Sequence, residues 1–516
     1  MKHTPVPVRL DADVLRTWVS GAVDLLAEHR STLDALNVFP VADSDTGTNL
    51  YLTLREGDRA VAALAPDASA GAVTRALTRG TLVGARGNSG VIVSQYLAGL
   101  LAEPAEEPEQ FAAALDRAAR LAYRAVAEPI EGTVLTVARA VGEAAVATER
   151  GDVRDVLDTA VDSGYRALVR TTDQLAPLRE AGVLDAGAWG LLLVLDALVE
   201  ALGGRRSRRS RRTRSRRTAR ESARTDSRGC ASHSHGGGAF EVMCIVKAAG
   251  ADDGAVQDLS RELSRVGESV AVVGGDGLWQ AHVHTDHPLP AVDAAAAVGQ
   301  VSQVRVRHIE AQTGVHGAHR PPLGLVTVTA APGLAADLAR AGAVVVLVRD
   351  GVAGAELERA VDDTGARVVL VLAAGGLLGA ARDPVEDAED SDLPRPRVQV
   401  VGGLSELQVV VGAATLATHE PGTDEDELAR AVTDAVAAVR MAEADAAGVG
   451  PARHARVVEA ATSLLADGAS LLTVLTGDDV PASVVDHLRA AVGGGGVDVV
   501  VLDTGNPGTT VLLGAE

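Results

Sequence analysis

The stretch Asn37-Val-Phe-Pro-Val-Ala-Asp-Ser-Asp-Thr-Gly-Thr-Asn-Leu50 places two carboxylates, Asp43 and Asp45, two residues apart in a turn-forming sequence. Carboxylates at this spacing can bind one hard cation, and Mg²⁺ accepts such oxygen ligands while it keeps several waters. The apolar run that starts at Leu50 predicts a helix, whose free N–H groups and positive dipole end suit a phosphate. The stretch therefore predicts a Mg-nucleotide site, although the same residue types also form ordinary turns with helix caps.

Three further segments repeat this arrangement of a small or polar loop before an apolar, helix-like run. They are Gly84-Ala-Arg-Gly-Asn-Ser-Gly90, Glu131-Gly-Thr133 and Asp185-Ala-Gly187. Glycine lets the backbone approach a ligand closely, and Ser or Thr adds a hydroxyl group. The recurrence favours the nucleotide interpretation, because several helix N-termini that meet at one end of a bundle would surround a polyphosphate.

The region that contains these loops, residues 8–202, is predicted to be all-α. Its apolar residues recur three and four positions apart, as in Val14, Leu15, Trp18 and Val19, and this period is typical of helices with one buried face. Strand-like alternation is scarce there.

The motifs resemble those of the DhaL-type ATP-binding domain known from dihydroxyacetone kinases, and most closely those of bacterial fatty acid kinase A subunits. The family pattern is roughly NVFPVPDGDTGTNM followed by GARGNSGVIxSQ, and this chain has NVFPVADSDTGTNL and GARGNSGVIVSQ. Ser44 stands where the family has glycine. The resemblance implies an antiparallel eight-helix barrel with Mg-ATP bound at one end.

The resemblance also implies roles for single residues. Asp43 and Asp45 would hold Mg²⁺, and Asn37 would assist the metal or brace the loop. The chain has only two lysines, Lys2 and Lys247, and no phosphate-binding loop of the GxxxxGK[ST] type. Metal, helix dipoles and Arg86 are therefore expected to balance the phosphate charge. The full set of expected nucleotide contacts is Asn37, Thr46, Gly47, Thr48, Asn49, Gly84, Arg86, Gly87, Asn88, Ser89, Gly90, Thr133, Asp185 and Gly187.

A Ser/Arg-rich tract follows the helical region and predicts a disordered linker at residues 203–239. Twelve arginines lie between positions 205 and 228, and residues 203–217 contain no apolar residue, so the tract cannot bury a core. Two interpretations stay open: a solvated linker, or a contact with RNA, an acidic lipid surface or an acidic partner.

Beyond the linker the pattern predicts an α/β middle domain at 240–318 and an α/β C-terminal domain at 321–516. In Ala281-His-Val-His284 the two histidines face one side of a strand, and Cys244 lies in another strand-like run. Cys244, His282 and His284 are a feasible Zn²⁺ set, and fatty acid kinase A subunits have a similar cysteine and HVHT segment. The alternative is that these three side chains only pack in the core.

The bulk composition limits the classes of partner. A net charge of −21 disfavours general nucleic-acid binding. Two cysteines suit a reducing cytoplasm, and no apolar stretch is long enough to predict a membrane span. We therefore expect a cytoplasmic protein.

The resemblance predicts an ATP-dependent phosphotransferase subunit that phosphorylates a fatty acid presented by a separate acyl-binding protein, with a homodimer expected by analogy. Two alternatives stay open at this point. One is a kinase for a small polyol such as dihydroxyacetone, and the other is a non-enzymatic nucleotide-binding regulator.

Overall fold

The computed structural model describes residues 10–40, 42–149, 151–205, 238–247, 253–275, 277–309, 323–349, 351–379, 396–419, 423–466, 468–493 and 496–516. Most of the Ser/Arg-rich tract predicted as a linker lies outside the described residues. Within them, no helix combines the length and the apolar character that crossing a membrane requires.

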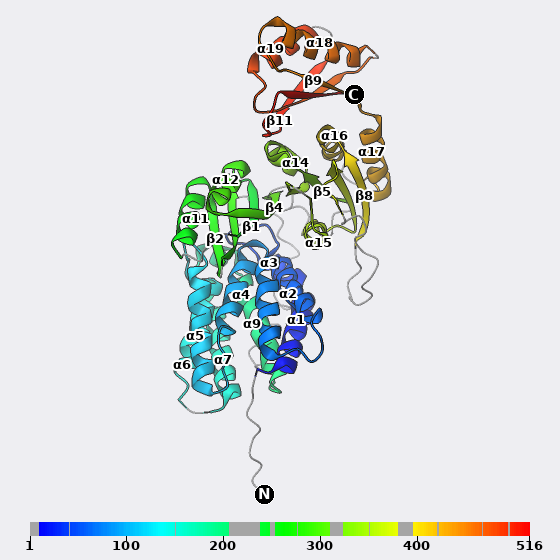
Figure 1. Ribbon diagram of the computed structural model, residues 1–516. Helices are drawn as coiled ribbons and strands as arrows, with labels where there is room; N and C mark the ends of the chain where they lie inside the picture. Colours follow the sequence, from blue (N-terminus) through cyan, green and yellow to red (C-terminus); the bar gives the residue numbers. More distant parts are fainter. Residues whose placement is uncertain are drawn as a thin grey trace.

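The N-terminal region is a barrel of antiparallel helices, which confirms the all-α prediction (Figure 1). In its described part, eight long helices and the short α8 follow one another: α1 Ala12–Leu36, α2 Thr46–Ala62, α3 Ala70–Gly84, α4 Gly87–Leu100, α5 Pro108–Arg124, α6 Val134–Val146, α7 Val153–Gln174, α8 Ala176–Ala181 and α9 Ala186–Ala201. Helix α1 packs on both α2 and α9, and α9 packs on α7. These contacts bring the first and last helices of the region together and close the ring.

The barrel is built from short aliphatic side chains around a few large ones, such as Trp18, Phe111 and Trp189. Side-chain caps define where helices begin: Asp152 accepts from the N–H groups of Arg154 and Asp155 at α7, and Asp185 accepts from that of Ala188 at α9. Such caps satisfy donors that the first turn of a helix leaves open. Because the helices alternate in direction, α2, α4, α6 and α9 all begin at the same end of the barrel.

The second part of the chain forms an eight-stranded sheet with the order β2-β3-β1-β4-β6-β5-β7-β8. Its first half contains β1 Phe240–Lys247, β2 Glu268–Gly275, β3 Leu278–Thr285 and β4 Gln300–His308, with helices α11 Asp253–Val266 and α12 Pro288–Val298. These strands are antiparallel. Helices α11 and α12 pack against the apolar face of these strands.

The other half of this sheet is parallel and contains β5 Leu323–Thr329, β6 Ala343–Leu347, β7 Val368–Ala374 and β8 Arg397–Leu404. Strand β4 pairs with β6, so the two α/β units expected from the sequence share one sheet. The helical elements of this half are η1 Pro332–Leu334, α14 Ala335–Arg340, α15 Gly354–Asp363, α16 Glu406–Ala417 and α17 Glu425–Ala438.

The C-terminal residues form a separate four-stranded sheet with the order β11-β10-β12-β9. It contains β9 Arg440–Asp445, β10 Leu471–Thr476, β11 Asp498–Asp503 and β12 Thr510–Ala515, covered by α18 Pro451–Leu465 and α19 Ala482–Val492. Figure 1 shows the antiparallel half of the large sheet lying over one end of the barrel, and the small sheet beyond it. An all-α region followed by α/β units is therefore the fold class of the chain.

Candidate active site between barrel and sheet

The four predicted loops meet at the barrel end where α2, α4, α6 and α9 begin. A Cβ atom added at Gly87, which has a φ of 56°, would overlap the side-chain amide of Asn49 on α2. A Cβ atom added at Gly187 would lie 3.7 Å from Oγ of Ser89 and 3.5 Å from Cβ of Val134. The helix N-termini form a cradle whose N–H groups and dipole ends suit a polyphosphate.

The acidic loop opens this cradle. Nδ2 of Asn37 donates to Oδ1 of Asp43, and Asp45 occupies the N-cap position of α2 without capping it through its side chain. Burial and the adjacent charge of Asp45 raise the pKa of Asp43 well above its usual range. Two carboxylates held this close repel each other when both are ionised, and a shared divalent cation relieves that repulsion. The pair therefore fits a Mg²⁺ ion.

Other predicted residues of the cradle are used in its construction. Oγ1 of Thr48 donates to Oδ2 of Asp34 at 2.8 Å and accepts from Nε of Arg30 at 2.9 Å, so it braces α2 against α1. Thr133 accepts from the N–H of Leu135 and caps α6. The hydroxyl group of Thr48 therefore already donates to Asp34 and accepts from Arg30, whereas the sequence predicted that it contacts a phosphate.

Several predicted glycines are required because helices approach closely. A Cβ atom at Gly47 would overlap the backbone of α1, and one at Gly84 or Gly90 would overlap side chains of α2. Thr46 and Asp185 are buried at the starts of α2 and α9. Burial raises the pKa of Asp185 to about 6 even though Ala188 and Val134 donate backbone hydrogen bonds to it. In the described part of the chain, the buried Oδ1 atom of Asn88 has no hydrogen-bond partner.

Arg86 is bound to groups of the protein in this structure. Its side chain is buried, and it donates from Nε to Oδ1 of Asp363 on α15 at 2.5 Å and from Nη1 to the carbonyl oxygen of Gly84 at 2.7 Å. The guanidinium group is thus bound to the second half of the chain. That Arg86 also balances phosphate charge stays a prediction, because Asp363 is shared with Arg305 and Nη2 of Arg86 has no hydrogen-bond partner in the described residues.

The antiparallel sheet presents a polar face to the barrel end. Nε2 of Gln280 on β3 donates to the carbonyl oxygen of Ala85 at 2.8 Å, and the N–H of Ala127 donates to the carbonyl oxygen of Val270 at 3.2 Å. Ala85 and Val91 of the barrel pack with Ala271 of β2. The acidic loop and this face of the sheet therefore line one site.

Four charged or titratable side chains of the polar face form a cluster: Glu241 on β1, His282 and His284 on β3, and Arg307 on β4. Potential ligand atoms of Glu241, His282 and His284 all lie within 4.8 Å of one another. Nε of Arg307 donates to Oε2 of Glu241 at 2.6 Å, and Nη2 of Arg307 lies 3.8 Å from Oδ2 of Asp45. Through Arg307, the cluster thus forms an ion pair with Asp45, one of the two predicted Mg²⁺ ligands.

The protonation states of this cluster suit a metal ion. Burial lowers the pKa of His282 to about 3, so its imidazole is neutral near pH 7. Burial by itself raises the pKa of Glu241, but the charge of Arg307 and its hydrogen bonds outweigh burial and lower this pKa below its usual value. In the described residues, neither ring nitrogen of His282 has a hydrogen-bond partner. A carboxylate with two neutral imidazoles is a donor set that transition metals accept.

Cys244 is not a member of this group, and this part of the prediction is wrong. Cys244 pairs with Ala281 in the register of β1 and β3, whereas Glu241 pairs with His284. Side chains alternate between faces along a strand, and Cys244 packs in the apolar core on the other face. Burial raises the pKa of its thiol to about 12. Glu241 occupies the position that the sequence analysis gave to the cysteine.

Three residues of the site were not among those predicted from the sequence: Glu241, Arg307 and Asp363. A signal for the first two was present, because Glu241 lies within the apolar run Phe240-Glu-Val-Met and Val304-Arg-Val-Arg places two charged residues at alternate positions of a buried strand. That alternation indicates a polar face. No comparable signal marks Asp363, which lies at the end of an amphipathic helix.

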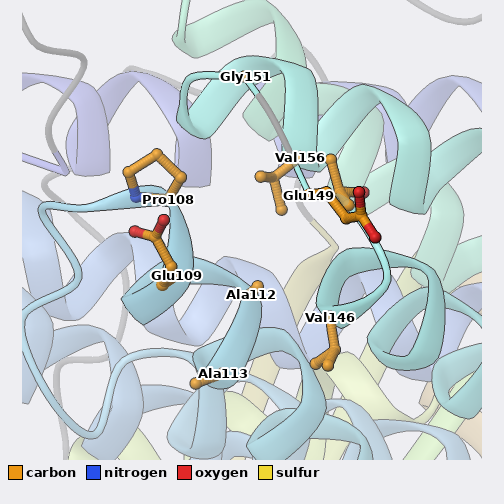
Figure 2. A pocket seen from close by; sticks show the side chains of 9 residues that line it. Pro108, Glu109, Ala112, Ala113, Val146, Glu149, Gly151 and Val156 are labelled. Carbon is orange, nitrogen blue, oxygen red and sulfur yellow. The ribbon is translucent and has the colours of Figure 1, made fainter.

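A cavity of about 250 Å³ lies at the opposite end of the barrel. Figure 2 shows its lining by the starts of α5 and α7 and the end of α6, including Pro108, Val146 and Val156. None of the predicted site residues is among its lining residues.

Comparison with known proteins gives two domain matches. Residues 40–200 match the DAK2 domain, and residues 238–315 match the middle domain of proteins like the fatty acid kinase A subunit. Among relatives, Protein YloV of Bacillus subtilis is 30% identical over 361 residues, which are 66% of this chain and 65% of YloV. An uncharacterized protein of Staphylococcus haemolyticus is 32% identical over 322 residues, which are 59% of this chain and 55% of that protein. The matched stretch thus spans less than two thirds of these relatives.

Solved structures give only distant likenesses. The dihydroxyacetone kinase of C. freundii, in complex with AMP-PNP and Mg²⁺, matches with a TM-score of 0.28 and 19% identity over 39% of this chain and 36% of that chain. A DegV family protein from Thermus thermophilus, described for fatty acid binding, matches with a TM-score of 0.29 and 13% identity over 38% of this chain and 99% of that chain. The chain therefore contains a region that matches the DAK2 domain, followed by a region that matches the middle domain of proteins like the fatty acid kinase A subunit.

Proposed function

We propose that the chain is the ATP-binding subunit of a phosphotransferase and that it binds Mg-ATP between the barrel end and the polar face of the sheet. The observation that carries this proposal is the Asp43–Asp45 pair at the mouth of a cradle formed by four helix N-termini. Phosphoryl transfer depends on positioning and on neutralisation of charge more than on a protein nucleophile. The helix N-termini would position the phosphate groups, and the metal ion held by the carboxylate pair would neutralise their charge.

The protein residues would act as follows. Asp43 and Asp45 would hold Mg²⁺, and the cation would supply neutralisation of phosphate charge. Asn37 fixes Asp43 through its hydrogen bond. The backbone N–H groups at the starts of α2 and α4 bind phosphate oxygens, and Asn49 and Ser89 add side-chain donors. The sheet covers the mouth and excludes water.

A second metal site is proposed at Glu241, His282 and His284. Two observations support this site. Three potential ligand groups are buried together, and the ring nitrogens of His282 have no hydrogen-bond partner in the described residues. Zn²⁺ suits this donor set. A metal ion at this site would fix the positions of β1 and β3 relative to each other and so fix the polar face that lies above the acidic loop.

The acceptor is proposed to be a fatty acid carboxylate presented by a separate acyl-binding protein, with an acyl phosphate as product. The match of residues 238–315 to the middle domain of proteins like the fatty acid kinase A subunit supports this acceptor over a small polyol. The same match favours an enzyme over a regulator. The Asp43–Asp45 pair, which is intact in both sequence and geometry, favours an enzyme as well.

The test is calorimetric titration of Mg-ATP into the wild type, Asp43→Asn and Asp67→Asn, each also without Mg²⁺. Asp67 is exposed in the loop between α2 and α3 and serves as the control. We expect Asp43→Asn to weaken binding at least tenfold and Asp67→Asn to leave it unchanged. Binding that is equal in all three proteins, or independent of Mg²⁺, would overturn the proposal. Transfer of labelled phosphate to a fatty acid on an added acyl-binding protein then tests the acceptor.

A further inference from the structure

The phosphate cradle obtains little positive charge from the barrel itself. Arg86 at the start of α4 is bound to Asp363, and Nε of Arg30 on α1 donates to Thr48. The chain has two lysines: Lys2, and Lys247, which is exposed at the C-terminal end of β1. Because both of these arginines are bound to protein groups, a cation from another part of the chain would strengthen the binding of a nucleoside triphosphate.

Arg307 on β4 is placed to supply that cation. Its side chain is buried, and Nη2 lies 3.8 Å from Oδ2 of Asp45. The bonds from Nε and Nη2 to Oε2 of Glu241 hold the guanidinium plane in place. In the described part of the chain, Nη1 of Arg307 donates no hydrogen bond to a protein group. An arginine has five N–H donors, so donors remain for a ligand.

The position relative to Asp45 determines what this ligand would be. Oxygen ligands of one Mg²⁺ lie about 3 Å apart, because each is about 2 Å from the metal. A phosphate oxygen that shares a metal with Asp45, on the side that faces Arg307, can therefore come within hydrogen-bond reach of the guanidinium group. Guanidinium and phosphate form strong, charge-assisted hydrogen bonds.

We propose that Arg307 contacts the phosphate groups of the bound nucleotide, so that the middle domain supplies a cation to a site otherwise formed by the barrel. This inference rests on the proposed nucleotide-binding function. It makes the nucleotide site a composite of two units that are far apart in the chain, and it gives Glu241 the role of orienting Arg307.

The competing interpretation is that Arg307 only neutralises Glu241. A single substitution of Arg307 does not separate the two, because it leaves a buried carboxylate without its partner. The double variant Glu241→Gln with Arg307→Gln removes both charges, and Glu241→Gln alone is its reference. Neutralisation predicts that the double variant binds Mg-ATP as well as its reference. A phosphate contact predicts that it binds more weakly.

The experiment titrates the full chain with Mg-ATP and with adenosine, which lacks phosphates. We expect the double variant to bind Mg-ATP at least tenfold more weakly than Glu241→Gln, in keeping with the loss of a charge-assisted hydrogen bond, and to bind adenosine equally well. Asp258→Asn with Arg261→Gln is the matched double control, because this exposed ion pair lies on α11 of the same domain, away from the polar face of the sheet. It is expected to keep its affinity for Mg-ATP within about threefold, since it removes no phosphate contact.

The outcomes separate the inference from the function on which it rests. If the wild type does not bind Mg-ATP, the proposed function fails, and the inference fails with it. If the wild type binds Mg-ATP and the double variant binds it as tightly as Glu241→Gln, the inference alone is overturned. An equal loss of affinity for adenosine and Mg-ATP also overturns it, because that loss does not involve phosphate.

Discussion

Nε of Arg86, at the N-cap position of α4, lies 2.5 Å from Oδ1 of Asp363, the last residue of α15. Oδ2 of the same carboxylate accepts from Nη1 of Arg305 on β4 at 2.6 Å. Burial by itself raises the pKa of Asp363, but the charges of Arg305, Arg86 and Arg307 hold it well below its usual range. One carboxylate thus joins the loop before α4, the antiparallel half of the sheet and its parallel half.

Asp363→Asn is predicted to destabilise the protein strongly. The substitution leaves two buried guanidinium groups without their carboxylate, and breaking a buried ion pair in this way costs about 3–5 kcal/mol. Asp362→Asn is the neighbouring control, because its partly exposed pair with Arg55 is expected to contribute about 1 kcal/mol or less. Urea denaturation of both variants measures the difference. Equal effects would show that the Asp363 contacts do not join these units.

Ser44→Gly is predicted to stabilise the protein. Ser44 has a φ of 57°, and a side chain in this left-handed region costs about 1–2 kcal/mol that glycine avoids. Because glycine also loses more backbone entropy on folding, the expected net gain is about 0.5–1 kcal/mol. Thermal unfolding of the metal-free protein measures it. Ser44→Val should lower the melting temperature, and a higher melting temperature for that variant would contradict the prediction.

Metal content is predicted to depend on Glu241 and not on Cys244. The purified wild type should contain about one transition-metal ion per chain, and Cys244→Ala should retain it. Glu241→Gln and His282→Ala should lose most of it, since each removes one of three ligands. Elemental analysis by mass spectrometry gives the stoichiometry. Loss of metal from Cys244→Ala, with Glu241→Gln unaffected, would restore the cysteine as a ligand.

The stability of the nucleotide-free protein is predicted to carry a pH dependence from Asp34. Burial raises the pKa of Asp34 to about 6, although Thr48 donates two hydrogen bonds to it. In the unfolded chain this carboxyl group ionises near 3.8. The unfolded state is therefore favoured as pH rises from about 4 to 6, by at most about 3 kcal/mol.

Asp34→Asn removes this titration, so the difference in unfolding free energy between the wild type and the variant should turn against the wild type between about pH 4 and 7. Chemical denaturation at several pH values measures it. Asp13→Asn, which changes an exposed residue near the start of α1, should give a constant difference. A difference that is equally constant for Asp34→Asn would contradict the shifted pKa.

The sequence by itself determined the features that depend on neighbouring residues. The period of apolar residues predicted the barrel helices, because that period follows from the geometry of a single helix. The spacing of Asp43 and Asp45 predicted a carboxylate pair, since two residues in one turn stay close however the rest of the chain folds. Alternation along β3 correctly predicted that His282 and His284 share one face.

Only the tertiary structure decided which distant residues meet these motifs. Whether Arg86 is available to a phosphate depends on Asp363, 277 positions further along the chain. Whether Cys244 or Glu241 joins the histidines depends on the register of β1 against β3, and a shift of one residue would exchange the two faces. Registers and interdomain ion pairs arise from the packing of whole elements, so no local pattern encodes them. For the same reason, the position of Arg307 beside Asp45 became visible only in the folded chain.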